Sequence, residues 1–398
     1  MSNKPANNIQ DLQYFGEFGG VNPSISDSAT YTFLHAKTML DTFEGHTEGC
    51  YLYSRHTSPS NLYLSQALAA MEFTETANVA ASGMGAITSV LLQVCGAGDH
   101  LISARTIYGG TYAFLKNFAP KLNISTSFVD ITSLEKVEAA ITPSTKMIYC
   151  EAISNPLLEI ANISALSKIA KKHNILVVVD NTFSPLMVSP QKLGADITIH
   201  SLTKFINGTN DTVGGVVCGT QQFIDSLRNV NDGAAMLLGP VMDSFRAASI
   251  LKNLRTLHIR MKKHSENAKY LAERFEKDGL KVVYPGLKSH KDHELFKTMY
   301  NEEYGFGGMM TVDVGNLDKA NELMELMQHE NLGYLAVSLG FYKTLFSAPG
   351  TSTSSEIPEE EQEAMGLSNG IVRFSIGLDQ DIERTYKCIK QCIQNAGG

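Results

Sequence analysis

The stretch ILVVVDNT (175–182) decides the predicted fold, because it places Asp180 directly after five apolar residues. A run of that length, rich in valine, is typical of a strand that is buried on both faces of a parallel sheet. Segments with helical periodicity alternate with similar apolar runs on both sides of it, namely KMIYCEAI (146–153), DITIHSL (196–202) and VGGVVCG (213–219). This alternation predicts a doubly wound α/β domain with a mostly parallel sheet.

The rest of the chain predicts two further regions around this domain. Residues 1–60 are rich in turn-forming residues and show little periodicity, so we expect an extended arm rather than an independent core. The α/β alternation occupies residues 61–256, and a long helical segment over about 241–277 leads out of it. Residues 257–398 predict a smaller α+β domain, with strands near KVVYPG (281–286), GGMMTVDVG (307–315) and IVRFSIG (371–377).

Composition and charge exclude several classes of protein. Of 398 residues, 43% are hydrophobic and 19% are charged, which is typical of a folded globular chain. With 33 basic and 41 acidic residues the formal net charge is −8, so the general attraction that nucleic-acid and anionic-membrane binders need is missing. The longest uncharged stretch, residues 76–98, contains too many small and polar residues to predict a membrane span. We expect small molecules and further copies of this chain as partners.

The N-terminus and the cysteines predict a cytoplasmic protein. The first twenty residues are polar and lack the apolar segment of a secretion signal. Six cysteines are spread through nearly the whole chain, so we expect free thiols in a reducing compartment. Cys388 and Cys392 stand four apart on a predicted helix, but no His or Cys cluster accompanies them, so they do not predict a metal site.

Ligands of doubly wound sheets bind where strands end, so the residues after each apolar run are the candidates for a site. The first candidate is SGMGAI (82–87), where small residues lead from a predicted strand into a helix. The backbone N–H groups of such a turn can hold a phosphate, and a tight turn without a ligand is the alternative. The glycines resemble the start of the dinucleotide motif GxGxxG, but Thr88 stands where the third glycine belongs.

Asp180 and Lys204 follow two different predicted strands. The Asp180 carboxylate needs a partner, which can be a pyridinium N–H or, alternatively, a helix cap or a loop ion pair. Lys204 can form a Schiff base with a carbonyl cofactor where a desolvated site lowers its pKa, whereas a solvated lysine is the common alternative. Ser201 and Thr203 offer hydroxyls for a phosphate. The spacing from Ser201 to Lys204 also matches the SxxK motif of serine β-lactamases, but the chain lacks their SDN and KTG motifs.

Arg373 places a guanidinium inside the otherwise apolar strand IVRFSIG (371–377). Its planar fork can bind the carboxylate of a substrate through two hydrogen bonds, and an internal Asp or Glu partner is the alternative. Together, the four candidates form a phosphate cradle, a pyridinium anchor, a Schiff-base lysine and a carboxylate clamp. An enzyme that transforms amino acids with pyridoxal phosphate (PLP) requires this set.

With these motifs the chain resembles the Cys/Met-metabolism family of PLP enzymes, which includes cystathionine γ-lyase, cystathionine γ-synthase and O-acetylhomoserine sulfhydrylase. The likeness runs from Tyr51 to the C-terminus and rests on YSR (53–55), SGMGAI (82–87), YGGT (108–111), EAISNP (151–156), VVVDNT (177–182), HSLTKFING (200–208), SLG (338–340) and RFSIGLD (373–379). Within the family, a plant-type branch that eliminates methanethiol from methionine is most similar at NISTSFVDIT (123–132), MLLGP (236–240) and SAPGTSTSSE (347–356).

The resemblance implies a fold, an assembly and residue roles. It implies the type I aminotransferase fold and a homotetramer built as a dimer of dimers. Lys204 would hold PLP covalently and shuttle protons, Asp180 would pair with the pyridine nitrogen, and Tyr108 would stack on the ring and later act as an acid. The phosphate of the cofactor would be bound by the Gly83 and Met84 amides with Ser201 and Thr203. Tyr53 and Arg55 would contact the phosphate in the neighbouring subunit. Arg373 would bind the substrate, with Ser338 and Asn155 nearby.

The implied reaction is PLP-dependent γ-elimination of L-methionine to methanethiol, 2-oxobutanoate and ammonia. The alternatives are γ-elimination of cystathionine and a γ-replacement that joins sulfide or cysteine to an activated homoserine. Departures from the family pattern at Gly110, Ser58-Pro59-Ser60 and Lys343 bear on arm packing and substrate preference but not on the cofactor. Two other classes remain as competitors, a nicotinamide-dependent dehydrogenase that rests on the partial glycine motif and a non-catalytic scaffold.

Overall fold

The computed structural model describes residues 3–352, 355 and 357–397. The chain divides into two compact units, one formed by Met1–Gln93, Ile199–Thr203 and Asp211–Arg255, and the other by Val94–Thr198, Lys204–Asn210 and Thr256–Gly398. The predicted domains 1–60, 61–256 and 257–398 stay a prediction. In the stretch SAPGTSTSSE (347–356), residues 353, 354 and 356 lie outside the described residues.

The larger sheet has seven strands in the order β1-β7-β6-β5-β4-β2-β3. Strand β2 pairs in parallel with β3 and β4, and β4 pairs in parallel with β5, whereas β1 and β7 pair antiparallel. The strands are β1 (Thr76–Ala80), β2 (His100–Ala104), β3 (Ser125–Val129), β4 (Thr145–Glu151), β5 (Leu176–Asp180), β6 (Ile197–Ser201) and β7 (Gly215–Gly219). Since helices alternate with these strands along the chain, the predicted α/β class is confirmed.

Helices in the second unit begin and end where the sequence supplies caps. Helix α7 (Ile163–His173) begins after Asn162, whose side chain accepts from the Ala165 N–H, and it ends at Asn174 in the left-handed conformation. The strand that follows it, β5, is buried over its last four residues, as its valine run predicts. This unit also contains the helices α5 (Gly109–Ala113), α6 (Leu134–Ala139) and α12 (His293–Lys297).

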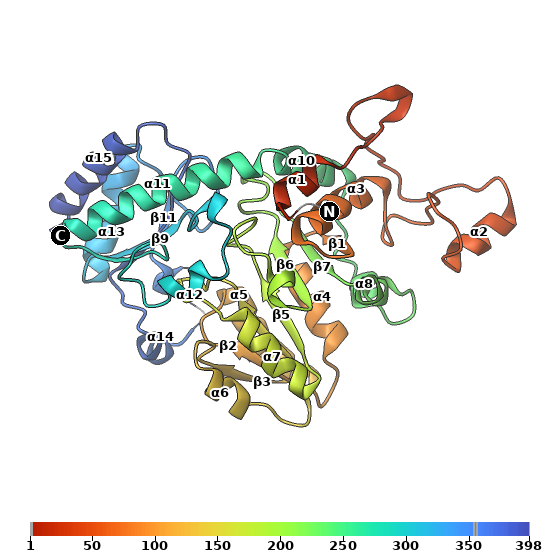
Figure 1. Ribbon diagram of the computed structural model, residues 1–398, viewed down its shortest axis with the longest axis horizontal. Coiled ribbons are helices and arrows are strands. Elements are labelled where there is room, and N and C mark those ends of the chain that lie inside the picture. The colour runs from red at the N-terminus through yellow and green to blue at the C-terminus, as the bar shows by residue number, and fades with distance from the viewer. Residues whose placement is uncertain (1–2, 353–354, 356, 398) are drawn as a thin grey trace. The chain divides into compact units, whose positions relative to one another are not determined.

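A smaller sheet in the same unit has the order β10-β11-β12-β9-β8 and is mainly antiparallel. Three helices lie beside it, and their apolar faces form a continuous core with it (Figure 1). The strands are β8 (Lys281–Val283), β9 (Met309–Asp313), β10 (Tyr334–Leu335), β11 (Leu345–Ser347) and β12 (Ile371–Ser375), and the helices are α11 (Leu257–Lys277), α13 (Leu317–His329) and α15 (Ile382–Asn395), with α14 (Glu359–Met365) preceding β12. This region confirms the predicted smaller α+β part.

The first unit contains most of the remaining helices. They are α1 (Pro5–Gln10), α2 (Ala36–Phe43), α3 (Pro59–Glu72), α4 (Gly83–Val94, which reaches the unit's boundary), α8 (Gln221–Arg228), α9 (Ala234–Leu238) and α10 (Ser244–Leu254). The helix predicted over about 241–277 is two helices, because Thr256 has a ψ of 4° and so interrupts the helical backbone between α10 and α11. Helix α10 starts at Asp243, whose carboxylate accepts from the Arg246 N–H.

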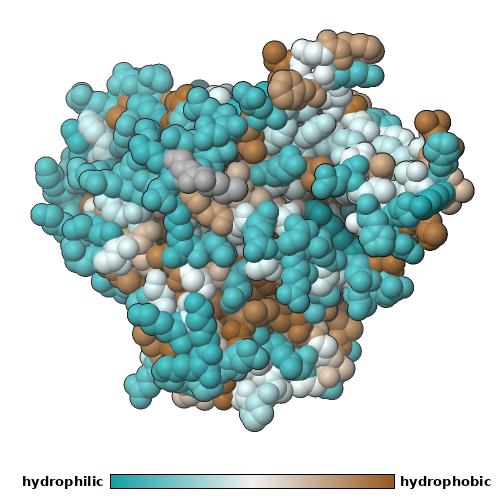
Figure 2. All heavy atoms as spheres, turned by 45° about the vertical axis from the view of Figure 1, so that its right-hand side comes forward, coloured by the Kyte–Doolittle hydropathy of each residue, from teal (hydrophilic) through white to brown (hydrophobic). Residues whose placement is uncertain are grey.

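The first sixty residues expose large apolar side chains. Helix α2 buries none of its residues, and the side chains of Phe18 and Leu34 are 99% and 95% exposed. Figure 2 shows one face of the structure, on which hydrophobic side chains stand among polar ones. Within the described ranges, none of the helices has both the length and the apolar character that crossing a membrane requires.

Candidate active site

Asp180 lies at the end of β5, as the valine run predicts, and its side chain is buried. Its Oδ1 accepts hydrogen bonds from the N–H and the hydroxyl of Thr182, at 3.0 and 2.5 Å. Its Oδ2 accepts from the Tyr149 hydroxyl at 3.4 Å. Burial, with the negative charges of Asp180 and Glu151, raises the pKa of Tyr149 well above its usual value, so Tyr149 stays a donor to Asp180.

Glu151 is the register partner of Asp180 on β4, and it is not among the site residues predicted from the sequence. One of its carboxylate oxygens accepts from the Tyr108 N–H and the other from the Asn155 N–H, both at 2.7 Å. Burial and the neighbouring Asp180 raise its pKa well above the usual range. The same rule that identified Asp180 could have found it, because Glu151 also closes a buried apolar strand.

Tyr108 precedes the short helix α5 and is 41% exposed, which leaves its side chain accessible. Its ring packs against the backbone of Gly110. A Cβ atom built on Gly110 would lie only 2.6 Å from the Tyr108 Cε1 atom. The departure from the family pattern at Gly110 therefore has a steric consequence, because any side chain there would push the Tyr108 ring from this position.

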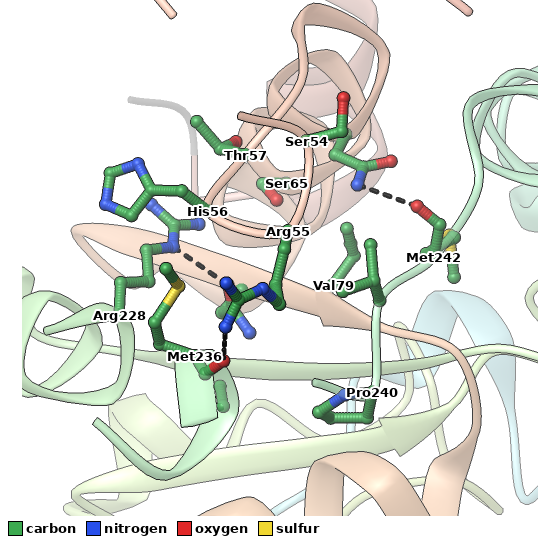
Figure 3. A pocket seen from close by; sticks show the side chains of 14 residues that line it. Ser54, Arg55, His56, Thr57, Ser65, Val79, Arg228, Met236, Pro240 and Met242 are labelled. Carbon is green, nitrogen blue, oxygen red and sulfur yellow. Dashed lines mark hydrogen bonds between the residues drawn. The ribbon is translucent and has the colours of Figure 1, made fainter. Parts of the chain in front are cut away.

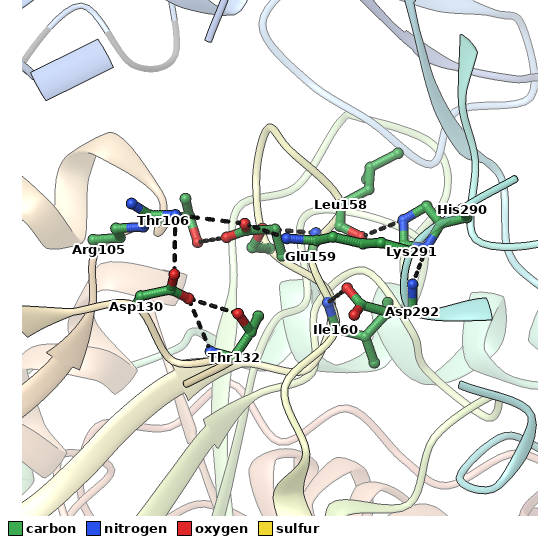
Figure 4. A network of polar contacts seen from close by, with 11 residues as sticks. Arg105, Thr106, Asp130, Thr132, Leu158, Glu159, Ile160, His290, Lys291 and Asp292 are labelled. Carbon is green, nitrogen blue, oxygen red and sulfur yellow. Dashed lines mark hydrogen bonds and ion pairs between the residues drawn. The ribbon is translucent and has the colours of Figure 1, made fainter. Parts of the chain in front are cut away.

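A polar network holds the segment that leads to Tyr108 (Figure 4). The Thr106 hydroxyl donates to the buried Glu159 carboxylate at 2.8 Å, and the Lys291 ammonium lies 2.8 Å from the other oxygen of that carboxylate. Arg105 adds a longer contact to Glu159 at 3.8 Å. Because Glu159 is almost fully enclosed, this pairing fixes the backbone two residues before Tyr108.

Lys204 lies in the same unit, beside the loop that carries the SLG motif. Its Nζ donates to the Ser338 hydroxyl at 3.2 Å, and Ser338 in turn donates to the Asn210 side chain at 2.9 Å. Burial, assisted by the positive charge of Arg373, lowers the pKa of Lys204 to about 8. At pH 7 about a tenth of this amine is therefore uncharged and nucleophilic, far more than for an ordinary lysine.

Arg373 occupies the middle of β12 and is almost fully buried. Its guanidinium donates to the Asn155 side-chain oxygen at 2.9 Å and to the Ser347 hydroxyl at 3.2 Å. Burial lowers its pKa to about 10, against the attraction of Glu151. Asn155 thus connects Glu151 with Arg373, since its N–H donates to the Glu151 carboxylate and its side-chain oxygen accepts from the Arg373 guanidinium.

The predicted phosphate-binding residues lie in the first unit. Gly83 begins α4, and a Cβ atom built on it would lie 2.8 Å from the Ser201 Cβ and 3.0 Å from its hydroxyl oxygen. Ser82 caps the helix by accepting from the Gly85 and Ala86 N–H groups. The Gly83 and Met84 N–H groups lie in the first turn of the helix, so the helix itself provides them no acceptor. The hydroxyl of Thr203, which is also a predicted phosphate ligand, accepts a hydrogen bond from the Gly214 N–H at 3.1 Å.

Tyr53 and Arg55 lie in the arm, as predicted. The guanidinium of Arg55 lies 5.7 Å from the centre of the Tyr53 ring and donates to the Met236 carbonyl at 3.3 Å. Arg55 lines a pocket together with Arg228 and His56 (Figure 3). Because the pocket holds the two guanidinium groups of Arg55 and Arg228, it is consistent with the prediction that Arg55 serves an anionic ligand.

The other two departures also have local explanations. Ser58 caps α3 by accepting from the Asn61 N–H, and Pro59 occupies the first turn, where it needs no hydrogen-bond acceptor. The Lys343 ammonium lies 4.8 Å from the centre of the Tyr334 ring, a cation–π contact. Ser58 and Pro59 thus act in starting a helix, and the Lys343 charge is directed at an aromatic face.

The residues present fit pyridoxal phosphate. One unit carries a partly buried amine with a lowered pKa, a buried carboxylate at a strand end and an exposed tyrosine, at Lys204, Asp180 and Tyr108. The other unit carries a helix start whose glycine leaves no room for a side chain beside Ser201. The amine suits a Schiff base, the carboxylate suits a pyridinium nitrogen, and the helix start suits a phosphate.

Comparison with known proteins gives the same result. A methionine γ-lyase of Arabidopsis thaliana is 44% identical over 96% of this chain and 88% of its own length. A cystathionine γ-lyase of Bacillus subtilis is 36% identical over 87% of this chain and 89% of its own length.

The structure is also similar to a crystal structure of a putative O-acetylhomoserine (thiol)-lyase of Campylobacter jejuni, with a TM-score of 0.91 and 28% sequence identity. The match covers 98% of this chain and 100% of that one, and that crystal structure contains N'-pyridoxyl-lysine-5'-monophosphate. The predicted type I aminotransferase fold is thereby confirmed. The family model for Cys/Met metabolism PLP-dependent enzymes matches residues 7–392. With a match of this extent, the chain belongs to the family of Cys/Met metabolism PLP-dependent enzymes.

Proposed function

We propose that the protein catalyses the PLP-dependent γ-elimination of L-methionine to methanethiol, 2-oxobutanoate and ammonia. The observation that carries the proposal is the state of the Lys204 amine, which is partly buried, donates to the Ser338 hydroxyl and has a pKa lowered to about 8. Such an amine can both bind a carbonyl cofactor and take a proton from carbon. The similarity to the Arabidopsis methionine γ-lyase supports methionine as the substrate.

Each residue role follows from its surroundings. PLP, when bound, supplies an electron sink that makes the hydrogen on the α-carbon of an amino acid acidic. Lys204, once released, would take that proton and would then remove a proton from the β-carbon, whose electron pair expels the sulfur from the γ-carbon. Asp180, held by Thr182 and Tyr149, would keep a proton on the ring nitrogen. Tyr108, whose side chain is accessible, would donate a proton to the departing sulfur.

Arg373 would bind the substrate carboxylate. Its position in a strand and its bonds to Asn155 and Ser347 restrict the guanidinium to one orientation, which favours two parallel hydrogen bonds to a carboxylate. Ser338 would lie at the substrate end of Lys204. The phosphate would be held by the amides of Gly83 and Met84 and by the hydroxyls of Ser201 and Thr203.

We also propose a homotetramer in which Tyr53 and Arg55 serve the phosphate of a neighbouring subunit. The support is the exposure of the first sixty residues, where Phe18 and Leu34 leave nearly all of their apolar surface uncovered. Large exposed apolar side chains of this kind are typical of surfaces that another chain covers. A cytoplasmic location stays a prediction.

A second candidate is a different γ-reaction with the same residues, either cleavage of cystathionine or replacement of an activated group by sulfide. The cystathionine γ-lyase and O-acetylhomoserine (thiol)-lyase among the similar proteins support it. The departure from the family pattern at Lys343, five residues after Ser338, leaves the substrate preference open to this candidate.

The test is a product assay with purified enzyme, PLP and methionine. We expect methanethiol in the headspace and an equal amount of 2-oxobutanoate, with neither product from the Lys204→Ala variant. The opposite pattern would be no product from methionine together with homocysteine from sulfide and O-acetylhomoserine. That result would show that the enzyme catalyses γ-replacement and not γ-elimination.

A further inference from the structure

Lys204 begins a tight turn of backbone. The Gly208 N–H donates to the Lys204 carbonyl at 2.8 Å, and Gly208 has a φ of +76°. A turn of five residues held by one such bond is weak by itself, because the carbonyls within it point outward and need partners. The direction of the Lys204 side chain depends on what holds this turn.

Arg260, in the first turn of α11, supplies those partners. Its guanidinium donates to the Phe205 carbonyl and, at 2.8 Å, to the Ile206 carbonyl. Gly208 makes room for it, since a Cβ atom built on Gly208 would lie 2.3 Å from the Arg260 Nη1. The guanidinium therefore binds two consecutive carbonyls that directly follow Lys204.

Other elements close the turn from different sides. Gly340, with a φ of +78°, presses on the backbone, and a Cβ atom there would lie 2.5 Å from the Phe205 nitrogen. The Phe205 ring is fully buried and meets the His264 ring edge-on at 5.2 Å between centres. His264 stands one helical turn after Arg260 and is hydrogen-bonded to the Ile376 carbonyl through Nδ1 at 2.6 Å. Arg260 thus belongs to a rigid support, and its own contribution is the pair of charge-assisted hydrogen bonds.

We propose that Arg260 is a positioning residue for Lys204, which holds the Phe205 and Ile206 carbonyls so that the lysine amine keeps one direction and stays shielded from water. This inference rests on the proposed role of Lys204. Arg260 acts through the backbone and forms no contact with the reacting atoms. Its loss would affect the chemistry of the amine more than the binding of substrate, because Arg373 and not this turn binds the carboxylate.

The test compares the holoenzyme with Arg260→Gln, which cannot donate to both carbonyls with a charged fork, and with Arg260→Lys. The matched control is Arg274→Gln on the same helix, where the guanidinium packs on the Tyr270 ring at 3.5 Å. We expect Arg260→Gln to lower kcat for methionine about 10- to 100-fold with KM changed less than about threefold. We expect Arg260→Lys to lose less, and the control to match the wild type.

Two readouts do not depend on turnover. The pH midpoint of the visible band of the Lys204-bound cofactor should move upward in Arg260→Gln, because a looser turn admits water to the nitrogen and favours its protonated form. The Gly208 amide should also exchange with deuterium faster. A folded Arg260→Gln enzyme with unchanged kcat, band midpoint and exchange would overturn the inference.

If Arg260→Gln does not fold, the same measurements on Arg260→Lys test the inference, since one ammonium group cannot bind both the Phe205 and the Ile206 carbonyl. A lowered kcat with a shifted band midpoint supports the inference, and wild-type values overturn it. Failure of the proposed function would appear separately, as a wild-type enzyme that carries PLP but releases no methanethiol.

Discussion

Lys204 shows how burial creates reactivity at a single residue. An ordinary lysine amine is almost fully protonated at neutral pH. Here burial and the charge of Arg373 lower the pKa to about 8, and the Ser338 hydroxyl accepts a hydrogen bond without adding a negative charge. The sequence predicted the position of this lysine from the end of a strand. It could not predict the pKa, which depends on residues more than a hundred positions away.

The lowered pKa predicts how the apoprotein recombines with PLP. The uncharged amine is the reactive form, and an amine loses its proton as the pH rises. The recombination rate should therefore increase with pH, and the midpoint of this increase should lie at about pH 8. Stopped-flow absorbance on apoprotein between pH 6 and about 10 measures it. A rate that keeps rising to the pKa of an ordinary lysine would contradict the burial described for this amine.

Gly110 predicts a second effect at the residue scale. In Gly110→Ala the new methyl group would meet the Tyr108 ring, because a Cβ atom there lies 2.6 Å from Cε1. We expect the ring to move and kcat for methionine to fall about 10-fold or more. The free energy of unfolding, measured in urea, should change by less than about 1 kcal/mol, since the Tyr108 ring is partly exposed. Unchanged kcat in a variant of normal stability would show that the ring position does not matter.

At the scale of elements, the strand ends of the larger sheet bring the polar groups of one unit together. The prediction of strands from apolar runs located Asp180 correctly, and the same rule applied to β4 would have located Glu151. Contacts that form between distant segments could not be predicted in this way. Arg260 stands on an ordinary helical stretch, and only the folded structure shows that it binds the turn after Lys204.

Glu151 predicts a loss of stability that depends on two hydrogen bonds. In Glu151→Gln a single oxygen remains to accept from the Tyr108 and Asn155 N–H groups, so one of them loses its partner. Leaving a buried donor unpaired costs about 1–3 kcal/mol, which urea unfolding would detect. The control is Glu138→Gln, an exposed carboxylate, which should cost less than about 0.5 kcal/mol. Equal effects of the two variants would mean that Glu151 does not hold these loops.

At the scale of the whole molecule, the first sixty residues are the part that the chain alone explains least. Turn-rich composition predicted an arm, and the structure gives it few buried residues of its own. Its sequence shows no periodic apolar pattern that would pair it with another element of this chain. The family resemblance, and not the periodicity, is what indicated that Tyr53 and Arg55 serve a neighbouring subunit.

The exposed arm predicts association. Substituting both Phe18 and Leu34 by serine removes two of its most exposed apolar side chains. If these side chains pack on another subunit, the variant should dissociate from tetramer toward dimer or monomer at protein concentrations where the wild type stays assembled. Light scattering after size-exclusion chromatography measures the mass. A wild-type chain that is monomeric throughout would contradict the proposed assembly.

The most direct test of the central claim is the visible absorption spectrum of the purified protein after incubation with PLP and removal of the unbound cofactor. If Lys204 binds the cofactor, the wild type should retain a visible band that borohydride fixes covalently at this residue. Lys204→Ala should lose the covalent label while remaining folded. A wild-type protein that stays colourless, or a label that appears on another lysine, would contradict the account.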